Sequence, residues 1–248
     1  MYNPFTLEGK TILVTGASSG IGRAIAIECS KMGATVFFTA RDEARLRETL
    51  ALMEGNGHQL FVADLTQEED IEALVEQLPQ LDGMVCAAGI SSLKPIQVLT
   101  EKDVQTIFAT NYTAPIMLTK ALIKKRKLES EASLVYISSI SGNGNTATAL
   151  SLYGSSKSAL NSFAKYAALE LAGKKIRCNT ICPGRIETNL LQNQTMSAED
   201  IEKDIAKYPL HRYGKPEEVA QAAIYLLSDA TKWVTGTSIT IDGGRTLA

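Results

Sequence analysis

Hydrophobic residues along this chain alternate between short continuous runs and longer segments in which they recur every three to four positions. A short continuous run is typical of a strand buried on both faces, and the longer spacing is typical of a helix with one apolar face. Because helical segments separate most of the runs, the pattern predicts a parallel sheet with helices on both faces. The predicted strands are residues 11–15, 35–40, 60–63, 84–88, 134–138, 176–181 and 238–241.

Capping residues mark the ends of several predicted helices. The first helix follows the first strand and should stop at Gly33. Asp42 is the expected N-cap of the second helix, and Thr66 with Glu69 forms the signature of a capping box at the third. A long fourth helix should open at residues 100–103 and run through residue 111. Later helices are expected over residues 153–171 and 216–227.

One long segment lacks a clear pattern. Residues 185–213 are rich in Gln, Asn, Asp and Lys. A loop-rich segment of this length inside a compact domain is usually functional. We find no internal repeat and no linker that would divide the chain. The sequence therefore predicts one domain over residues 1–248, with a ligand-contacting loop at about 185–213.

Composition and charge exclude several classes of protein. The 25 Lys and Arg residues against 27 Asp and Glu give a net charge of −2, so no broad basic field is available for nucleic acid or an anionic membrane. The basic cluster at 124–127 is short, and a solvated helix end is favoured over a binding patch. No apolar run approaches the roughly 20 residues of a membrane span. We expect no nucleic-acid or membrane partner.

Cysteine and histidine usage points to a reducing compartment without a metal site. The four cysteines contain no CxxC pair, and the N-terminus lacks the charged start and apolar stretch of a signal peptide. With only His58 and His211, a zinc site built on imidazoles is not expected. These features favour a cytoplasmic protein that binds no metal.

A glycine-rich turn, TGASSGIG at residues 15–22, directly follows the first predicted strand. A dinucleotide site requires a tight turn, close approach of the pyrophosphate and helix N–H groups that point at the anion. Glycine allows these because it lacks a Cβ atom. Glycine turns also close ordinary loops, but this position favours a nucleotide site. The expected contacts in the turn are Gly16, Ser18, Ser19, Gly20, Ile21 and Gly22.

Tyr153 and Lys157 are four residues apart and therefore share a face of a predicted helix. A carbonyl that receives a hydride develops negative charge on oxygen and needs a proton donor. A neighbouring ammonium lowers the pKa of a phenol, so we expect Lys157 to lower the pKa of Tyr153. An exposed helical pair is the alternative. Before them, three candidate hydroxyls, those of Ser138, Ser139 and Ser141, close the fifth predicted strand.

The turn T-G-x-x-x-G-x-G and the Tyr-Lys pair resemble motifs of the short-chain dehydrogenase/reductase family. The resemblance covers nearly the whole chain, with motifs in the family's order, and is greatest to β-ketoacyl-carrier-protein reductase-like members. It implies a Rossmann-type doubly wound parallel sheet of about seven strands in a single α/β domain. It also implies a homotetramer or homodimer, with the closing strand at 241–244 packed across a subunit interface.

The resemblance assigns a catalytic group of Ser139, Tyr153, Lys157 and Asn111. Ser139 lies 14 residues before Tyr153 and matches the family's strand-end serine, which hydrogen-bonds the substrate oxygen. Lys157 would also hold the nicotinamide ribose. Asn111 would hold a water in a proton relay; the alternative is a buried polar residue satisfied by its neighbours. Pro115, four residues later, fits a local break in that helix.

Two neighbouring residues decide between the two nicotinamide cofactors. An acid at the end of the second strand binds the 2′-hydroxyl of NAD, whereas an arginine accommodates the 2′-phosphate of NADP. Asp42 lies 20 residues after Gly22, near the expected spacing, but Ala40 holds the position where NAD-dependent relatives carry their acid. Arg41 resembles the arginine of NADP-dependent relatives. NADP(H) is therefore favoured over NAD(H), with a plain surface arginine as the alternative.

Other positions match the family's cofactor contacts only by resemblance. Asp64, with Leu65 after it, resembles the adenine-contacting acid, and a turn acid at a helix entry is the alternative. Relatives usually show Asn-Asn-Ala-Gly after the fourth strand, whereas this chain has Cys86-Ala87-Ala88-Gly89. We interpret Cys86 as a small buried hydrophobe rather than a redox-sensing thiol. The remaining expected cofactor contacts are Ala88, Gly89, Tyr153, Lys157, Pro183, Gly184, Ile186 and Thr188.

Together these features predict an NAD(P)-dependent oxidoreductase that reduces a carbonyl to a secondary alcohol, or the reverse. A 3-oxoacyl thioester reductase is one candidate, and a sugar, polyol or steroid dehydrogenase is the alternative. No decisive basic patch is present to receive an acidic carrier protein, and Arg185 and Lys203 are candidates for such a contact. Residues 189–212 are expected to fold over the small-molecule substrate. A catalytically idle NADP-binding regulator on the same fold is the rival hypothesis.

Overall fold

The computed structural model describes residues 2–188 and 197–248. Its seven parallel strands form one sheet in the order β3-β2-β1-β4-β5-β6-β7, which confirms the predicted doubly wound α/β fold. The strands are β1 Thr11–Thr15, β2 Thr35–Ala40, β3 Gln59–Val62, β4 Leu81–Cys86, β5 Leu128–Ile137, β6 Arg177–Pro183 and β7 Ser238–Ile241.

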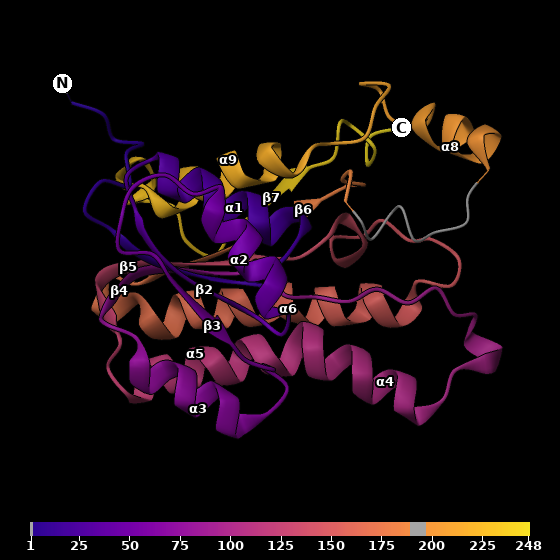
Figure 1. Ribbon diagram of the computed structural model, residues 1–248. Helices are drawn as coiled ribbons and strands as arrows, with labels where there is room; N and C mark the ends of the chain where they lie inside the picture. Colours follow the sequence, from indigo (N-terminus) through magenta and orange to yellow (C-terminus); the bar gives the residue numbers. More distant parts are fainter. Residues whose placement is uncertain (1, 189–196) are drawn as a thin grey trace.

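Helices cover both faces of this sheet (Figure 1). One apolar cluster lies between the sheet and α1 and α9, and a second lies between the sheet and α3, α5 and α6. The α-helices among the described residues are α1 Gly20–Lys31, α2 Glu43–Ala51, α3 Glu68–Gln77, α4 Glu101–Phe108, α5 Ala114–Lys124, α6 Ser151–Leu171, α8 Ala198–Ile205 and α9 Pro216–Leu227. None of them is long and apolar enough to cross a membrane.

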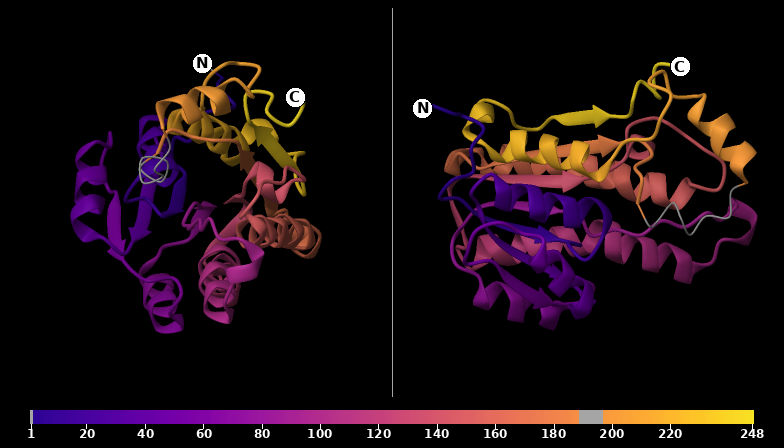
Figure 2. Two further views of the ribbon diagram at one scale, coloured as in Figure 1. Left: turned by 90° about the vertical axis from the view of Figure 1, so that its right-hand side faces the viewer. Right: turned by 45° about the horizontal axis from the view of Figure 1, so that its top comes forward.

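The strand order reverses between β1 and β4. In an open α/β sheet, ligands bind at such a reversal, outside the carboxyl ends of the strands. Figures 1 and 2 show that these ends face the part of the molecule that carries α4, α8 and the C-terminus. A ligand site is therefore expected among the loops that follow β1, β2 and β4.

The observed caps test the predicted helix starts. Asp42 caps α2 by accepting a hydrogen bond from Arg45 N at 3.1 Å, and Thr100 with Asp103 forms a true capping box at α4. The predicted box at Thr66 is wrong, because α3 starts one residue later, at an N-cap without a side-chain bond. Thr66 is held instead by Asp64, at 2.8 Å between the hydroxyl and Oδ1.

The predicted long fourth helix is interrupted. A single π-helical turn, Ala109–Thr113, separates α4 from α5. Pro115, at the start of α5, has no N–H to donate, and the Thr119 hydroxyl donates to its carbonyl at 2.7 Å. Such π turns often occur at functional sites, and this one contains Asn111.

The predicted loop at 185–213 contains a helix, α8, that the sequence did not indicate. In the last turn of α8, Asp204 accepts a hydrogen bond from the Tyr213 hydroxyl at 3.0 Å and forms an ion pair with Arg185 at 3.2 Å. These contacts tie the end of α8 to the chain that leaves β6. The part of the expected substrate segment at 189–196 lies outside the described residues.

The basic cluster at 124–127 lies where α5 ends. Lys125 forms an ion pair with Glu76, and Lys127 donates to the carbonyls of Glu76 and Leu78 at the end of α3. The cluster therefore joins two helix ends, as a structural element rather than a binding patch.

Candidate active site

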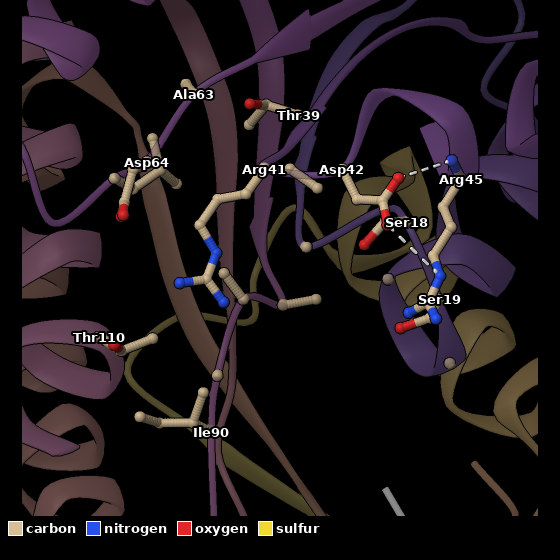
Figure 3. Close-up of a pocket in the computed structure, with 18 of the residues that line it drawn as sticks. Ser18, Ser19, Thr39, Arg41, Asp42, Arg45, Ala63, Asp64, Ile90 and Thr110 are labelled. Atoms are coloured by element: carbon tan, nitrogen blue, oxygen red, sulfur yellow. Dashed lines mark hydrogen bonds and ion pairs between the residues drawn. The ribbon is translucent and has the colours of Figure 1, made fainter. Parts of the chain in front are cut away.

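A cavity of about 800 Å³ opens at the reversal between β1 and β4 (Figure 3). The glycine-rich turn forms one wall, the ends of β2 and β3 form the second, and the chain after β4 forms the third. The cavity thus gathers residues that are far apart in the sequence. The predicted cofactor contacts that line it are Gly16, Ser18, Ser19, Gly20, Ile21, Gly22, Arg41, Asp64, Leu65, Ala88, Gly89 and Thr188.

The turn requires glycine at two of its positions. Gly16 has a φ of +69°, and a Cβ there would lie 2.7 Å from the Cα of Ala88. A Cβ on Gly22 would lie 2.3 Å from the carbonyl oxygen of Gly16. These glycines allow the start of α1 to pack against the chain after β4. The unpaired N–H groups of the first turn of α1 therefore lie at the cavity wall.

The ends of β2 and β3 form a rim of mixed charge. Partial burial would raise the pKa of Asp64, but two hydrogen bonds from Thr66 and the positive charge of Arg41 hold it below its usual value. Figure 3 shows the Arg41 side chain extending into the same space as Asp64. Asp42 is engaged as the α2 cap, so its carboxylate has the structural role that the sequence allowed.

Lys157 is buried beside the cavity. Its Nζ donates to the Ile137 carbonyl at 2.9 Å and lies 5.9 Å from the ring centre of Tyr153. A Cβ placed on Gly89 would lie 3.3 Å from this Nζ and 3.3 Å from Oδ1 of Asn111. Gly89 therefore lines the cavity and also lies next to Lys157 and Asn111 of the predicted catalytic group.

Tyr153 differs from the sequence-based expectation. Burial raises its pKa, and the hydrogen bond from Ser139 only partly opposes this. The expected lowering by Lys157 is therefore wrong for this geometry, because its ammonium lies beside the ring and bonds a backbone carbonyl. At neutral pH, Tyr153 is a protonated phenol that can donate its proton.

The three strand-end serines have separate partners. Ser139 hydrogen-bonds Tyr153 and accepts a bond from Ser141 N at 3.1 Å. Ser138 instead donates to the Lys157 carbonyl at 3.1 Å. Of the three hydroxyls, that of Ser139 therefore lies at the phenol, where the resemblance placed it.

Asn111 is almost fully buried in the π-helical turn. Its Oδ1 accepts from Ile90 N at 2.9 Å, and its Nδ2 donates to Ile90 O at 2.9 Å and to Ser156 at 3.1 Å. The side chain is therefore satisfied by its neighbours, and it holds the loop after Gly89 against α6. These contacts are those of a buried polar residue satisfied by its neighbours, and a role of Asn111 in a proton relay stays a proposal.

Besides Tyr153 and Lys157, three predicted cofactor contacts in the segment that ends and follows β6 lie outside the cavity wall. Pro183 ends β6 beside Ile241, and Gly184 N donates to the Ile241 carbonyl at 2.9 Å. The Ile186 side chain is part of the apolar core, while Thr188 reaches the cavity opposite Gly20. This segment therefore borders the site mainly through Thr188.

Cys86 is buried in the apolar cluster on the side of α3, α5 and α6. Burial raises the pKa of its thiol to about 12, and its sulfur lies 3.7 Å from that of Met84. A protonated, inaccessible thiol fits the interpretation of Cys86 as a small hydrophobe and opposes a redox sensor.

The sequence did not indicate several polar residues of the cavity, among them Thr39, Glu43, Arg45 and Thr110. Arg45 on α2 lines it, three residues after the Asp42 cap. Thr39 also lines it, and its buried hydroxyl has no partner among the described residues. The i, i+3 spacing indicates that Arg45 can pair with Asp42, but it does not place Arg45 at the cavity.

Burial makes Lys157 sensitive to pH. It lowers the pKa of Lys157 from 10.5 to about 8, so between these values the unfolded chain binds more protons than the folded protein. The contribution of Lys157 to stability therefore rises with pH across this window. We expect the free energy of unfolding of wild type minus that of Lys157→Met to increase by about 2 kcal/mol from pH 8 to pH 10. Urea unfolding at several pH values measures this, and a flat difference would show an unperturbed lysine.

The residues present fit a dinucleotide. The glycine turn admits a close backbone approach, α1 presents its N-terminus, the rim carries two arginines, and Thr39 retains an unpartnered hydroxyl. Beside this cavity, a serine, a tyrosine and a lysine converge near Gly89. Fold and site together define a dinucleotide-binding oxidoreductase.

Comparison with known proteins agrees with this class. The family described as Enoyl-(Acyl carrier protein) reductase matches residues 16–246. A tropinone reductase homologue of Arabidopsis thaliana is 34% identical over 251 residues, covering 98% of this chain and 92% of the relative. The 3-oxoacyl-[acyl-carrier-protein] reductase FabG of Rickettsia felis is 33% identical over 239 residues, covering 96% and 97%.

A solved structure extends the comparison to three dimensions. The RhlG/NADP active-site complex of Pseudomonas aeruginosa superposes with a TM-score of 0.91 at 32% identity and covers 99% of each chain. The chain belongs to the short-chain dehydrogenase/reductase family of oxidoreductases, which bind a nicotinamide cofactor and act on small molecules.

Proposed function

We propose that this protein is an NADP(H)-dependent reductase that converts a carbonyl to a secondary alcohol, or performs the reverse oxidation. The observation that carries the proposal is the convergence of Ser139, Tyr153 and Lys157 beside Gly89, where the cavity ends. A protein that only binds a nucleotide has no need of a phenol next to a buried ammonium at this point.

The catalytic residues divide the proton work. When bound, the nicotinamide supplies the hydride or accepts it. The Ser139 hydroxyl holds the substrate oxygen, and the protonated phenol of Tyr153 donates its proton to that oxygen. Lys157 would hold the ribose, and Asn111 supports the return of a proton from solvent. The raised pKa of Tyr153 keeps the phenol protonated at neutral pH, which is the form that a proton donor requires.

The rim supports NADP(H) over NAD(H). Arg41 lines the cavity, whereas Ala40 provides no acid at the strand end. Asp42 is occupied as a helix cap and as a partner of Arg45. The related RhlG structure is described with NADP, which agrees with this preference.

We further propose a 3-oxoacyl thioester as substrate, with a ketone of a sugar, polyol or steroid as the alternative. The named activity of the Rickettsia relative supports the thioester. Arg185 and Lys203 form ion pairs with Asp204 and Glu199, so they offer little attraction for an acidic carrier protein. A small free thioester is therefore the first substrate to test. Residues 185–213 would cover it.

The test is oxidation of NADPH and NADH by purified protein with acetoacetyl-CoA, a ketosugar, a ketosteroid and a diketone. We expect turnover with kcat/KM at least about tenfold higher for NADPH, the effect of one charge-assisted phosphate contact. A preference for NADH would overturn the cofactor assignment. Tight NADPH binding without turnover of any carbonyl would favour the idle regulator instead.

Assembly into a homotetramer or homodimer is part of the proposal. Tyr166 and Leu169 on α6 expose 65% and 77% of their surface, and Trp233 is fully exposed. Apolar residues gathered on one helix face suit association between subunits. Sedimentation equilibrium measures the assembly, and a monomer at micromolar concentration would contradict it.

A further inference from the structure

A second arginine reaches the cavity from a different element. Arg41 enters from the end of β2, and Arg45 lines the same cavity from the first turn of α2 (Figure 3). The Arg45 side chain is 54% exposed, so an anion in the cavity can approach it from solvent. The rim thus carries two guanidinium groups where the sequence indicated one.

The backbone at Arg45 is fixed to the glycine-rich turn. Nη2 of Arg23 donates to the Ser18 carbonyl at 2.6 Å and to the Arg45 carbonyl at 3.2 Å. The buried Thr49 hydroxyl lies 2.8 Å from the Ala17 carbonyl and 3.0 Å from that of Arg45, and donates to one of them at a time. Both side chains span from the turn to α2. Arg45 is therefore held in a set position relative to the pyrophosphate-binding turn.

The side chain of Arg45 is oriented by Asp42. One carboxylate oxygen accepts from Arg45 N at 3.1 Å, and the other lies 3.5 Å from Arg45 Nε. Because this ion pair uses Nε, the two terminal nitrogens keep their donor protons, and neither has a protein partner within residues 2–188 and 197–248. The same contacts offset the charge of Asp42, which would otherwise repel a phosphate at this rim.

We propose that Arg45 is a second ligand of the 2′-phosphate of NADP(H), so that Arg41 and Arg45 hold it from two sides. This rests on the proposed cofactor and adds a specificity-determining residue to it. A guanidinium binds phosphate through paired hydrogen bonds, but a single exposed ion pair contributes little. Two guanidinium groups on fixed elements therefore distinguish NADP(H) from NAD(H) more strongly than one exposed arginine does.

The test measures binding of the adenosine half alone, so it does not depend on turnover. Titration calorimetry compares 2′,5′-ADP with 5′-AMP on wild type, Arg45→Gln, Arg41→Gln and Arg47→Gln. Arg47 is the matched control: it is on the same helix, is exposed and does not itself line the cavity, although its ion-pair partner Glu43 does, so Arg47→Gln tests the loss of a nearby positive charge without the loss of a cavity arginine. Thermal midpoints of all variants check that the fold is kept.

We expect Arg45→Gln to weaken 2′,5′-ADP by roughly tenfold and 5′-AMP by less than about twofold, the loss of one charge-assisted contact. Arg47→Gln should change neither by more than about twofold. If Arg41→Gln abolishes the preference for 2′,5′-ADP over 5′-AMP and Arg45→Gln leaves that preference intact, the proposal for Arg45 is overturned while the assignment of NADP(H) stands. Equal affinity of wild type for both ligands overturns both.

Discussion

Tyr153→Phe is expected to lower kcat by about 10²–10⁴-fold, the contribution of a positioned general acid, while NADPH affinity stays within about twofold. The phenol is buried, bonds Ser139 and is kept protonated at neutral pH by its surroundings. Removal of one oxygen takes away the proton donor without opening a void. Steady-state kinetics with the best carbonyl, together with direct NADPH titration, measures both effects.

Tyr136→Phe is the matched control. Tyr136 is fully buried and loses one hydrogen bond, to the Thr119 hydroxyl at 3.0 Å, but it lies away from the cavity wall. We expect it to cost about 1 kcal/mol of stability and to keep turnover near that of wild type. A variant Tyr153→Phe as active as this control would remove Tyr153 from the mechanism.

Gly22→Ala should disrupt both the fold of the turn and nucleotide binding. The added methyl would lie 2.3 Å from the Gly16 carbonyl oxygen and 2.7 Å from its carbon, and both are backbone atoms. The turn must open to relieve this contact, which moves the N-terminus of α1 away from the cavity. We expect a loss of about 2 kcal/mol in unfolding free energy and of order 100-fold in NADPH affinity.

Gly173→Ala separates this effect from a general penalty on glycine. No atom lies within 4 Å of a Cβ at Gly173, so we expect changes within about 0.5 kcal/mol and unaltered NADPH binding. Urea unfolding and calorimetry report the two quantities for each variant. Normal NADPH affinity in Gly22→Ala would show that the tight turn is not needed to hold the cofactor.

The sequence predicted those features of the fold that depend on a single local pattern, such as a continuous apolar run or a proline at a helix start. The limits of β2 and β7 match the expected runs, and α9 begins at Pro216 as its proline indicated. The glycine-rich turn lies between β1 and α1, and Tyr153 and Lys157 share α6, as the sequence indicated. These features depend on local backbone geometry, which a short stretch of sequence determines.

Features that depend on tertiary contacts were missed. Thr66 and Glu69 have the spacing of a capping box, but Asp64 engages Thr66 and moves the start of α3. Arg45 became part of the cavity only because Arg23 and Thr49 hold α2 against the glycine turn. No local pattern reveals such contacts between distant segments.

The predicted direction of the Tyr153 pKa shift was wrong for a related reason. The spacing from Lys157 showed that the two groups share a helix face, but not that burial is the larger effect on each of them. Desolvation raises the pKa of the phenol and lowers that of the ammonium, so each neutral form is favoured. Burial is a property of the whole fold, and the spacing of two residues on one helix does not reveal it. The proton-donating role proposed for Tyr153 is unchanged, because a raised pKa keeps the phenol protonated.

Transfer of deuterium tests the central claim most directly. Protein is mixed with NADPH that carries deuterium at both C4 positions of the nicotinamide and with acetoacetyl-CoA, or with the carbonyl that gives the highest turnover, and the alcohol product is analysed by mass spectrometry. The account predicts one deuterium on the carbinol carbon of the product, and none with Tyr153→Phe over the same time. NADPH oxidation that leaves the product unlabelled, or no alcohol from any carbonyl, would contradict it.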